Sequence, residues 1–325
     1  MKHSYATISF LNVGYGDSAL IVYTNEQGSY TILIDGGAGY HENFPRVTAA
    51  DYLAKKGIRK IDLMVVTHLH EDHVGGLSEV SERTEIKEIW CTCTLPEIPS
   101  EIDRTLCKTA NEKKLANALN RFNSLCERQR KRGGIIRQYD SLNSGTELAG
   151  GLRVSRLWPD EAMAAEQERL IKAVYEAPEL NRTEALIRLN NTLNDSSMAL
   201  KVSCCGKDLL FCADAGRIAW SNLLKQEDAL KADVIKLPHH GHAGDITTEM
   251  VKAVNPAYAV CSVSNDRKDG CPEKEVFDLL HKNNPSVRLL FTDAVCLPPY
   301  ASGKAHEAVE LVIDRDTFNC GEQDT

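Results

Sequence analysis

A largely apolar run that ends in a cluster of histidines is the feature that most constrains the fold of this chain. Residues 61–66 are mostly apolar and branched, and they predict a buried strand. Gly75-Gly76 and a segment of helical character follow, so the chain changes from strand to helix at this point. The polar cluster between the two consists of His68, His70, Asp72 and His73.

The spacing of this cluster indicates a metal site. His68 and His70 are two residues apart, and in an extended segment this spacing directs both imidazoles to one side. Asp72 and His73 come after the chain has turned, so they can face the same cavity from another direction. Three imidazoles and a carboxylate this close together commonly hold a divalent metal ion. The alternative is a solvated loop that is rich in histidine by chance.

Strands and helices alternate along most of the remaining chain. Short runs rich in β-branched residues open the protein as a meander, and the second half repeats a strand–helix pattern after a hairpin around Gly206. This pattern predicts an α/β fold in which two sheets pack face to face and helices cover both outer faces. Besides 61–66, the principal expected strands are 7–13, 18–23, 30–34, 86–91, 152–158, 198–204, 208–213, 232–237, 258–263, 287–291 and 308–313.

The chain is expected to form a single domain, residues 1–325, because no low-complexity linker divides it. Two segments interrupt the alternation, at about 96–145 and 159–193, and their composition predicts helices at 105–131 and 159–177. These helical inserts are expected to shape the mouth of the site. Cations near the end of the first helix are expected to offset its dipole, and a patch for a phosphate-rich substrate is the alternative. They are Arg128, Arg130, Lys131 and Arg132.

The composition is that of a soluble globular enzyme, with 42% hydrophobic and 26% charged residues among 325. A net charge of −8 argues against a surface for indiscriminate polyanion binding. No apolar run approaches the ~20 residues of a membrane helix, and the first residues do not read as a secretory signal. We therefore expect a cytoplasmic location, no membrane partner, and eleven cysteines that are reduced thiols rather than a disulfide framework.

Four motifs in a fixed order make the chain resemble the metallo-β-lactamase superfamily. They are Asp35-Gly36-Gly37, the cluster His68-x-His70-x-Asp72-His73, Asp214, and His239-His240-Gly241. Within the superfamily the chain is most similar to the lactamase-like domain of ComEC-type DNA-uptake proteins, in a free-standing form. The segments that carry this closer resemblance are 10–18, 194–200, 236–241 and Thr292-Asp293.

The resemblance implies a four-layer αβ/βα sandwich with two divalent metal ions, Zn²⁺ or Mn²⁺, at one edge between the sheets. His68 and His70 would hold the first ion, and Asp214 would bridge both. The residues that would hold the second ion are Asp72, His73 and His240.

The resemblance also implies a nucleophile and groups that assist it. A hydroxide shared by two ions ~3.5–4 Å apart would attack the substrate at neutral pH. Asp35 would orient a ligand imidazole. Asp72 or a nearby histidine would handle the proton, and His239 would contact the substrate.

Three positions depart from the pattern of these relatives. The usual third histidine of the first metal is missing, and Asp195, or Asn194, is the nearest replacement; an oxygen ligand would favour harder ions such as Mn²⁺. His242 stands where the ComEC-like group commonly has serine, so it could bind metal or substrate. Cys271 stands where that group has histidine, which removes an imidazole that could donate a proton or bind a phosphate.

The function favoured by the resemblance is a metal-dependent phosphodiesterase or nuclease that acts on a phosphodiester substrate such as DNA or RNA. An alternative is hydrolysis of a small ester, thioester or lactam, which suits the acidic composition better because nucleic-acid-binding proteins usually carry a basic stripe. A further alternative, from another class, is a metal-bound sensor or partner-binding module without catalytic activity, whose protein partner the sequence does not identify.

Overall fold

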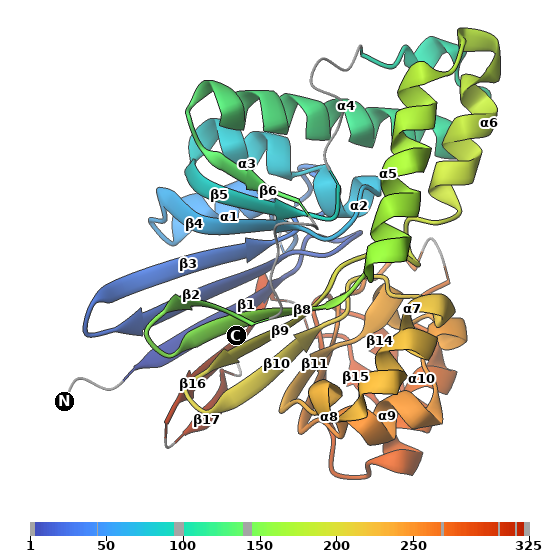
Figure 1. Ribbon diagram of the computed structural model, residues 1–325. Coiled ribbons are helices and arrows are strands. Elements are labelled where there is room, and N and C mark those ends of the chain that lie inside the picture. Colours follow the sequence, from blue (N-terminus) through green and yellow to red (C-terminus); the bar gives the residue numbers. More distant parts are fainter. Residues whose placement is uncertain are drawn as a thin grey trace.

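Two sheets face each other, and helices cover the outer face of each in the computed structural model of the chain (Figure 1). The structure describes residues 4–43, 45–93, 101–138, 145–267, 270–304, 306–315 and 317–321. Three buried apolar clusters fill the layers: one between the sheets and one beneath each helical layer. This is the four-layer αβ/βα sandwich that the sequence predicted.

The first sheet begins as an antiparallel meander and continues with parallel strands. Strands β1 to β3 are antiparallel, and β3, β4, β5 and β6 pair in parallel. Strand β16 returns from the C-terminal part of the chain to pair with β1. In the described part of the chain, the order across the sheet is β17 (Phe318–Gly321), β16 (Ala308–Asp314), β1 (Tyr5–Leu11), β2 (Ala19–Asn25), β3 (Gly28–Ile34), β4 (Lys60–Val66), β5 (Glu85–Cys91) and β6 (Ile135–Arg137).

The second sheet combines an antiparallel half with a parallel half. Strands β7 to β10 are antiparallel, and β10 to β13 are parallel. Strands β14 (Cys296–Leu297) and β15 (Ala301–Ser302) form a separate small ribbon. In the described chain the order is β13 (Arg288–Phe291), β12 (Tyr258–Cys261), β11 (Val234–Lys236), β10 (Lys207–Phe211), β9 (Ala199–Cys204), β8 (Leu152–Trp158) and β7 (Thr146–Ala149).

The helices divide between the two outer faces (Figure 1). One layer lies on the first sheet, with α5 and α6 packed beside α4. It contains α1 (Ala49–Lys55), α3 (Leu77–Arg83), α4 (Ala110–Lys131), α5 (Glu161–Glu176) and α6 (Glu179–Asn190). The other layer lies on the second sheet and contains α7 (Arg217–Leu223), α8 (Glu227–Leu230), α9 (Thr248–Val254) and α10 (Lys274–Asn283).

Helix α4 illustrates how local sequence sets an element. The Thr109 hydroxyl accepts from the backbone N–H of Glu112, and the Glu112 carboxylate accepts from the Thr109 hydroxyl and from the backbone N–H of Lys108. This capping box starts the helix at Ala110, later than the predicted 105. Its buried face then repeats at intervals of three and four residues: Leu115, Leu119, Phe122 and Cys126.

The inserts and their cations differ in part from the sequence prediction. The second insert contains two helices, α5 and α6, because Pro178 cannot continue the first and instead caps the second. Arg128 donates to the Ser81 hydroxyl and to Glu82, and Arg132 donates to the Ser81 carbonyl, so these two cations attach α4 to α3. No disulfide joins the described cysteines. Among the described helices, none combines the length and apolarity that a membrane crossing requires.

Candidate metal centre

The histidine cluster lies where β4 gives way to the short helix α2 (Glu71–Val74). His68 is in the connecting loop, and His70 precedes the first helical residue as its N-cap. Asp72 and His73 therefore stand on the first turn of α2, and all but His70 are buried. The next two residues, Gly75 and Gly76, pass so close to another part of the backbone that there is no room for a side chain. A Cβ atom on Gly75 would lie 2.3 Å from the Ala38 carbonyl oxygen, and one on Gly76 would lie 2.1 Å from that of Gly36.

The second sheet delivers two more side chains to the same place. Asp214 follows β10, and His240 lies in the short turn η4 (Pro238–Gly241) after β11. Because β10 and β11 are parallel, their carboxyl ends meet at one edge of the sheet. His239 and His240 are adjacent, and both have left-handed backbones, with φ of 46° and 52°. Both side chains line the same cavity.

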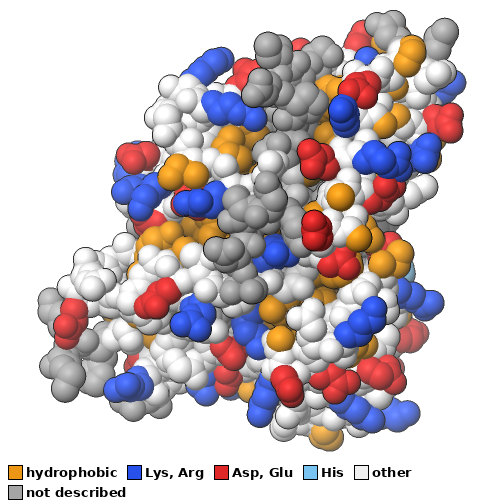
Figure 2. Space-filling view, viewed as in Figure 1, with side chains coloured by type: hydrophobic (Ala, Val, Ile, Leu, Met, Phe, Trp, Pro, Cys, Tyr) orange, Lys and Arg blue, Asp and Glu red, His pale blue; other side chains and the backbone are white. Residues whose placement is uncertain are grey.

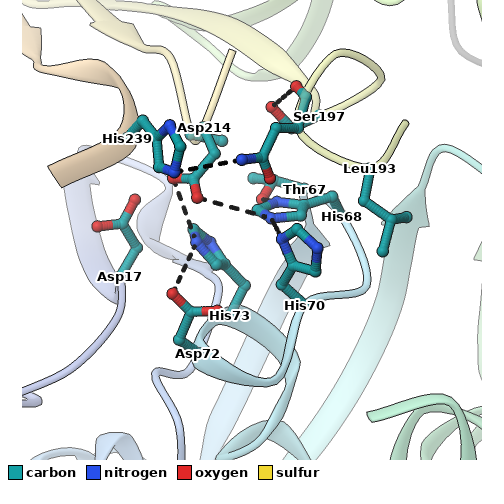
Figure 3. A network of polar contacts seen from close by, with 12 residues as sticks. Asp17, Thr67, His68, His70, Asp72, His73, Leu193, Ser197, Asp214 and His239 are labelled. Atoms are coloured by element: carbon teal, nitrogen blue, oxygen red, sulfur yellow. Dashed lines mark hydrogen bonds and ion pairs between the residues drawn. The ribbon is translucent and has the colours of Figure 1, made fainter. Parts of the chain in front are cut away.

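Six of the seven predicted ligands form two groups that share Asp214. One group consists of His68, His70 and Asp214, and the other of Asp72, His73, Asp214 and His240; within each group the possible ligand atoms lie within 4.8 Å of one another. Figure 3 shows the imidazoles of His68, His70 and His73 close to Asp214.

The two oxygens of Asp214 face different groups. Its Oδ1 lies 3.3 Å from His73 Nε2 and 3.7 Å from His240 Nε2, whereas its Oδ2 lies 3.9 Å from His68 Nε2. His73 Nε2 and Asp214 Oδ1 are both buried without a hydrogen-bond partner. Buried polar atoms that lack partners are costly, and a metal ion would satisfy both. The residues present therefore fit a pair of divalent ions with Asp214 between them.

The charges of the cluster suit a cation. Burial, and then the neighbouring imidazoles of His73 and His70, lower the pKa of His68 well below its ordinary value, and burial lowers the pKa of His70. Burial alone would raise the pKa of Asp214, but His73 and His240 hold it well below the usual range. The same two histidines lower the pKa of Asp72 against its burial. Ionised carboxylates and neutral imidazoles are the forms that bind metal.

His73 differs from the other two early histidines. Burial would lower its pKa, but the carboxylates of Asp214 and Asp72 outweigh burial and raise it well above its ordinary value. A proton on His73 and a metal ion beside it would both neutralise the negative charge of these carboxylates. Metal binding here would therefore release a proton.

Asp35 holds the loop and one ligand in place, as the sequence predicted. Its Oδ2 accepts from Nδ1 of His73 at 2.8 Å and from the Thr67 hydroxyl at 2.6 Å, and its Oδ1 accepts from the Thr67 backbone N–H at 2.9 Å. Burial raises the pKa of Asp35, and these hydrogen bonds oppose that rise. With Nδ1 engaged, His73 presents Nε2 to the cluster.

A buried ion pair behind His240 was missed from the sequence. Lys236 donates to Asp17, and both side chains are largely buried. Asp17 also lies 3.5 Å from His240 Nδ1 through its Oδ1, and its backbone N–H donates to the Asp72 carbonyl oxygen. In the sequence, Asp17 lies between two expected strands, 7–13 and 18–23, and no role was assigned to its side chain. The available signal was Lys236, a lysine within an apolar strand, which requires a buried partner.

Asp195 does not join the cluster, contrary to the sequence prediction. Its Oδ1 accepts from the backbone N–H of Ile218 at 3.4 Å, and Gly216 lies against it, so the carboxylate faces the start of α7. Among the described residues, it belongs to neither group of potential ligands. The neighbouring Asn194 lines the cavity instead.

The cluster opens into a cavity of about 430 Å³. Helices α4 and α6 contribute Asn111, Lys114 and Asn190 to its wall, so the inserts do shape the site. Cationic and polar groups on the wall include Lys114, Arg267, His239 and His242. Cys271 also lines it.

A second histidine–aspartate group lies on the cavity wall. Asp245 Oδ2 accepts from His239 Nδ1 at 2.6 Å and lies 3.3 Å from His242 Nδ1. The imidazole rings of His239 and His242 stack with their centroids 5.2 Å apart. Burial would lower the pKa of His239, but the hydrogen bond to Asp245 and the charge of Asp214 raise it. The sequence had left the role of His242 open. Asp245 was missed, and the sequence feature that could have identified it is its spacing from His239 and His242.

Part of this chain is similar to a known protein family. Residues 11–104 match the family model described as "Metallo-beta-lactamase superfamily". The curated protein "ComE operon protein 3" of Bacillus subtilis (strain 168) is 22% identical over 304 residues, which cover 89% of this chain. The match covers 32% of that protein, so the chain spans about a third of its length.

Solved structures with similar folds include several metal-dependent enzymes. Igni18, described as a novel metallo hydrolase from Ignicoccus hospitalis KIN4/I, is 14% identical with a TM-score of 0.49, covering 95% of this chain and 98% of its own. A diphosphatase from the PhnP family is 13% identical with a TM-score of 0.46 and the same coverage. Zn²⁺-bound PqqB from Methylobacterium extorquens is 12% identical with a TM-score of 0.44, covering 94% of this chain and 99% of its own.

Proposed function

Since the chain carries a metallo-beta-lactamase superfamily domain, we propose that it is a metal-dependent hydrolase of phosphodiester bonds. The observation that carries the proposal is the pair of ligand groups that share Asp214 at the base of a cavity. Two divalent ions, Zn²⁺ or Mn²⁺, would polarise the scissile phosphate and lower the pKa of a water molecule, as in two-metal phosphatases and nucleases.

The protein's own groups have distinct parts in this proposal. His68 and His70 would hold one ion, Asp214 both, and the remaining ligands the other. Asp72 is the proposed acceptor of the proton from the attacking water, because its carboxylate lines the cavity beside the proposed ions. His239 lies on the cavity wall, where the sequence predicted a contact with the substrate.

The cavity wall favours an anionic substrate over a neutral one. Lys114 and Arg267 line it, and the Lys114 ammonium lies 5.7 Å from the centre of the Tyr15 ring. The acidic Glu71 on the same wall is already engaged, because it accepts from the Asn117 amide and from the Tyr40 hydroxyl. The other carboxylates on the wall, Asp72 and Asp214, are proposed metal ligands, so the bound ions would offset their charge. Lys114 and Arg267 would then suit a phosphate group better than a lactam or a simple ester.

The volume of the cavity and the charges on the surface indicate the size of substrate to test. A volume of about 430 Å³ lies within the range of small-molecule sites, which is roughly 300–1,000 Å³. On the face seen in Figure 2, lysines and arginines are interspersed with acidic residues and form no continuous stripe over the described residues. A compact phosphodiester is therefore the first substrate to test, and DNA and RNA are the second.

The test is hydrolysis by purified protein loaded with Mn²⁺ or Zn²⁺. We expect turnover of bis-para-nitrophenyl phosphate that Asp214→Ala abolishes and that His41→Ala, on the exposed surface, leaves unchanged. Parallel assays use single- and double-stranded DNA, RNA and para-nitrophenyl acetate. Turnover of the acetate alone would replace the proposal with the small-ester alternative. Bound metal without turnover of any of these would support the non-catalytic binding module.

A further inference from the structure

The two ligand groups of the metal centre are unequal. The group around Asp72 has four side chains, whereas the group around His68 has three, counting the shared Asp214 in both. A divalent ion with nitrogen and oxygen ligands commonly takes four or more. The structure assigns the missing protein ligand of the first ion to the side-chain oxygen of Asn194. This inference deepens the proposed function, on which it rests for the presence of the metal.

The first observation is an unpartnered oxygen. Asn194 Oδ1 is buried and has no hydrogen-bond partner, although a buried amide oxygen ordinarily accepts one. The residue lines the same cavity as His70 and Asp214. Its segment is held against the cluster, because the backbone N–H of Met198 donates to the Thr67 carbonyl oxygen at 2.9 Å, next to His68.

The second observation is a chain of hydrogen bonds that fixes the orientation of the Asn194 amide. Asp245 Oδ2 lies 2.6 Å from His239 Nδ1 and holds this imidazole in place. His239 Nε2 lies 3.2 Å from Asn194 Nδ2. The NH₂ group of the Asn194 amide therefore faces His239, and its oxygen faces the other way.

This chain gives His239 and Asp245 a role through Asn194. Both are positioning residues that hold the amide oxygen toward the first ion, in the way that carboxylate–histidine pairs orient metal ligands elsewhere. It also explains why Asp195 is not needed as a ligand: its carboxylate is engaged by the Ile218 backbone N–H. A carbonyl-type oxygen in place of an imidazole shifts the first site toward harder ions such as Mn²⁺.

The experiment is a Mn²⁺ titration of metal-free protein, in which free Mn²⁺ is counted by electron paramagnetic resonance. We expect two bound ions in the wild type. Asn194→Ala should weaken one of them by about 10–100-fold and leave the other unchanged, because the Asp72 group is intact. Asn194→Asp keeps an oxygen at the same place and should retain both ions. Asp245→Ala should weaken the same ion as Asn194→Ala, because it releases His239.

The matched control is Asn190→Ala, which removes an asparagine from the same cavity wall. It should bind both ions as the wild type does. Wild-type binding of both ions by Asn194→Ala, or an equal loss in Asn190→Ala, would overturn the assignment. If Asn194→Ala fails to fold, the comparison of Asp245→Ala with Asn190→Ala decides in its place. The readout is separate from catalysis: a protein that loses one ion in Asn194→Ala but hydrolyses no ester would refute the proposed function and keep this inference.

Discussion

Asp35 shows how a single buried side chain can control the metal centre without being a ligand. It accepts from His73 and from both the hydroxyl and the backbone N–H of Thr67. We predict that Asp35→Asn lowers metal affinity by about 10–100-fold, because the ring of His73 loses its charged anchor. The Mn²⁺ titration measures this. Asp62→Asn, which affects a carboxylate that accepts from the Thr31 backbone N–H in the same sheet, is the control. Unchanged affinity in Asp35→Asn would rule out the anchoring role.

The ion pair of Lys236 with Asp17 provides a test at the same scale. We predict that Lys236→Met costs about 3–5 kcal/mol of unfolding free energy, because the buried Asp17 carboxylate then keeps only the His240 imidazole, 3.5 Å away, to offset its charge. Urea denaturation of the metal-free protein measures the loss. Lys207→Met breaks a half-exposed pair with Asp233 and should cost at most about 1 kcal/mol. Equal losses of unfolding free energy in the two variants would show that the buried pair contributes no more to stability than the half-exposed pair.

Single residues were predicted well where identity and order were enough. The six histidines and aspartates that the structure groups were all proposed as ligands from the sequence, because few other uses explain such side chains at strand ends. Asp17 and Asn194 were not singled out in the same way. Their importance comes from partners far along the chain, Lys236 and His239, and from burial, neither of which a linear sequence displays.

The turn between β1 and β2 fits against α2 because Gly16 has no side chain. A Cβ atom there would lie 1.9 Å from the Asp72 carbonyl oxygen, and φ is +114°. Gly28 has a similar φ of +128° with no atom within 4 Å of its Cβ position, so Gly28→Ala isolates the cost of the backbone conformation. We predict that Gly28→Ala lowers the free energy of unfolding, measured by thermal unfolding, by about 1–3 kcal/mol. Gly16→Ala should lower the free energy of unfolding by more, and it should also bind the second ion more weakly. Equal effects of both would show that the contact with Asp72 is unimportant.

Helix α4 clamps the helix that carries two of the ligands. Arg121 donates to the carbonyl oxygens of Ala38 and Gly75, and Asn117 donates to Glu71. We predict that Arg121→Ala lowers stability by about 1–3 kcal/mol in urea, because it leaves carbonyl groups without their partner. It should also weaken the ion held by Asp72 and His73. Lys131→Ala, which removes only an exposed pair with Glu127, should change neither quantity; a matching loss there would contradict the clamp.

At the scale of elements, the sequence predicted strands and helices better than their ends and turns. Periodicity identified the sheets, because buried strands and amphipathic helices both leave regular patterns. It did not separate α5 from α6 at Pro178, and it gave no indication of the backbone conformation of His239 and His240. The left-handed backbone of both histidines follows from how η4 packs beyond β11, which local propensity does not determine.

For the molecule as a whole, the metal centre joins the two sheets. The first sheet and α2 supply His68, His70, Asp72 and His73, whereas the second sheet supplies Asp214 and His240. Bound ions should therefore stabilise the entire sandwich. We predict that a chelator lowers the free energy of unfolding, by about 2.7 kcal/mol for each ion whose free concentration was 100 times its Kd, and with it the unfolding midpoint. Urea unfolding with and without chelator measures this. Identical midpoints would mean that no ion links the sheets.

Metal content of the Asp214→Ala variant tests the central claim most directly, because both ligand groups depend on this one carboxylate. The measurement is elemental analysis of purified, folded protein, with wild type and Asn190→Ala beside it. The account predicts two divalent ions per chain in the wild type and in Asn190→Ala, and loss of both in Asp214→Ala. Two ions retained in Asp214→Ala would contradict it.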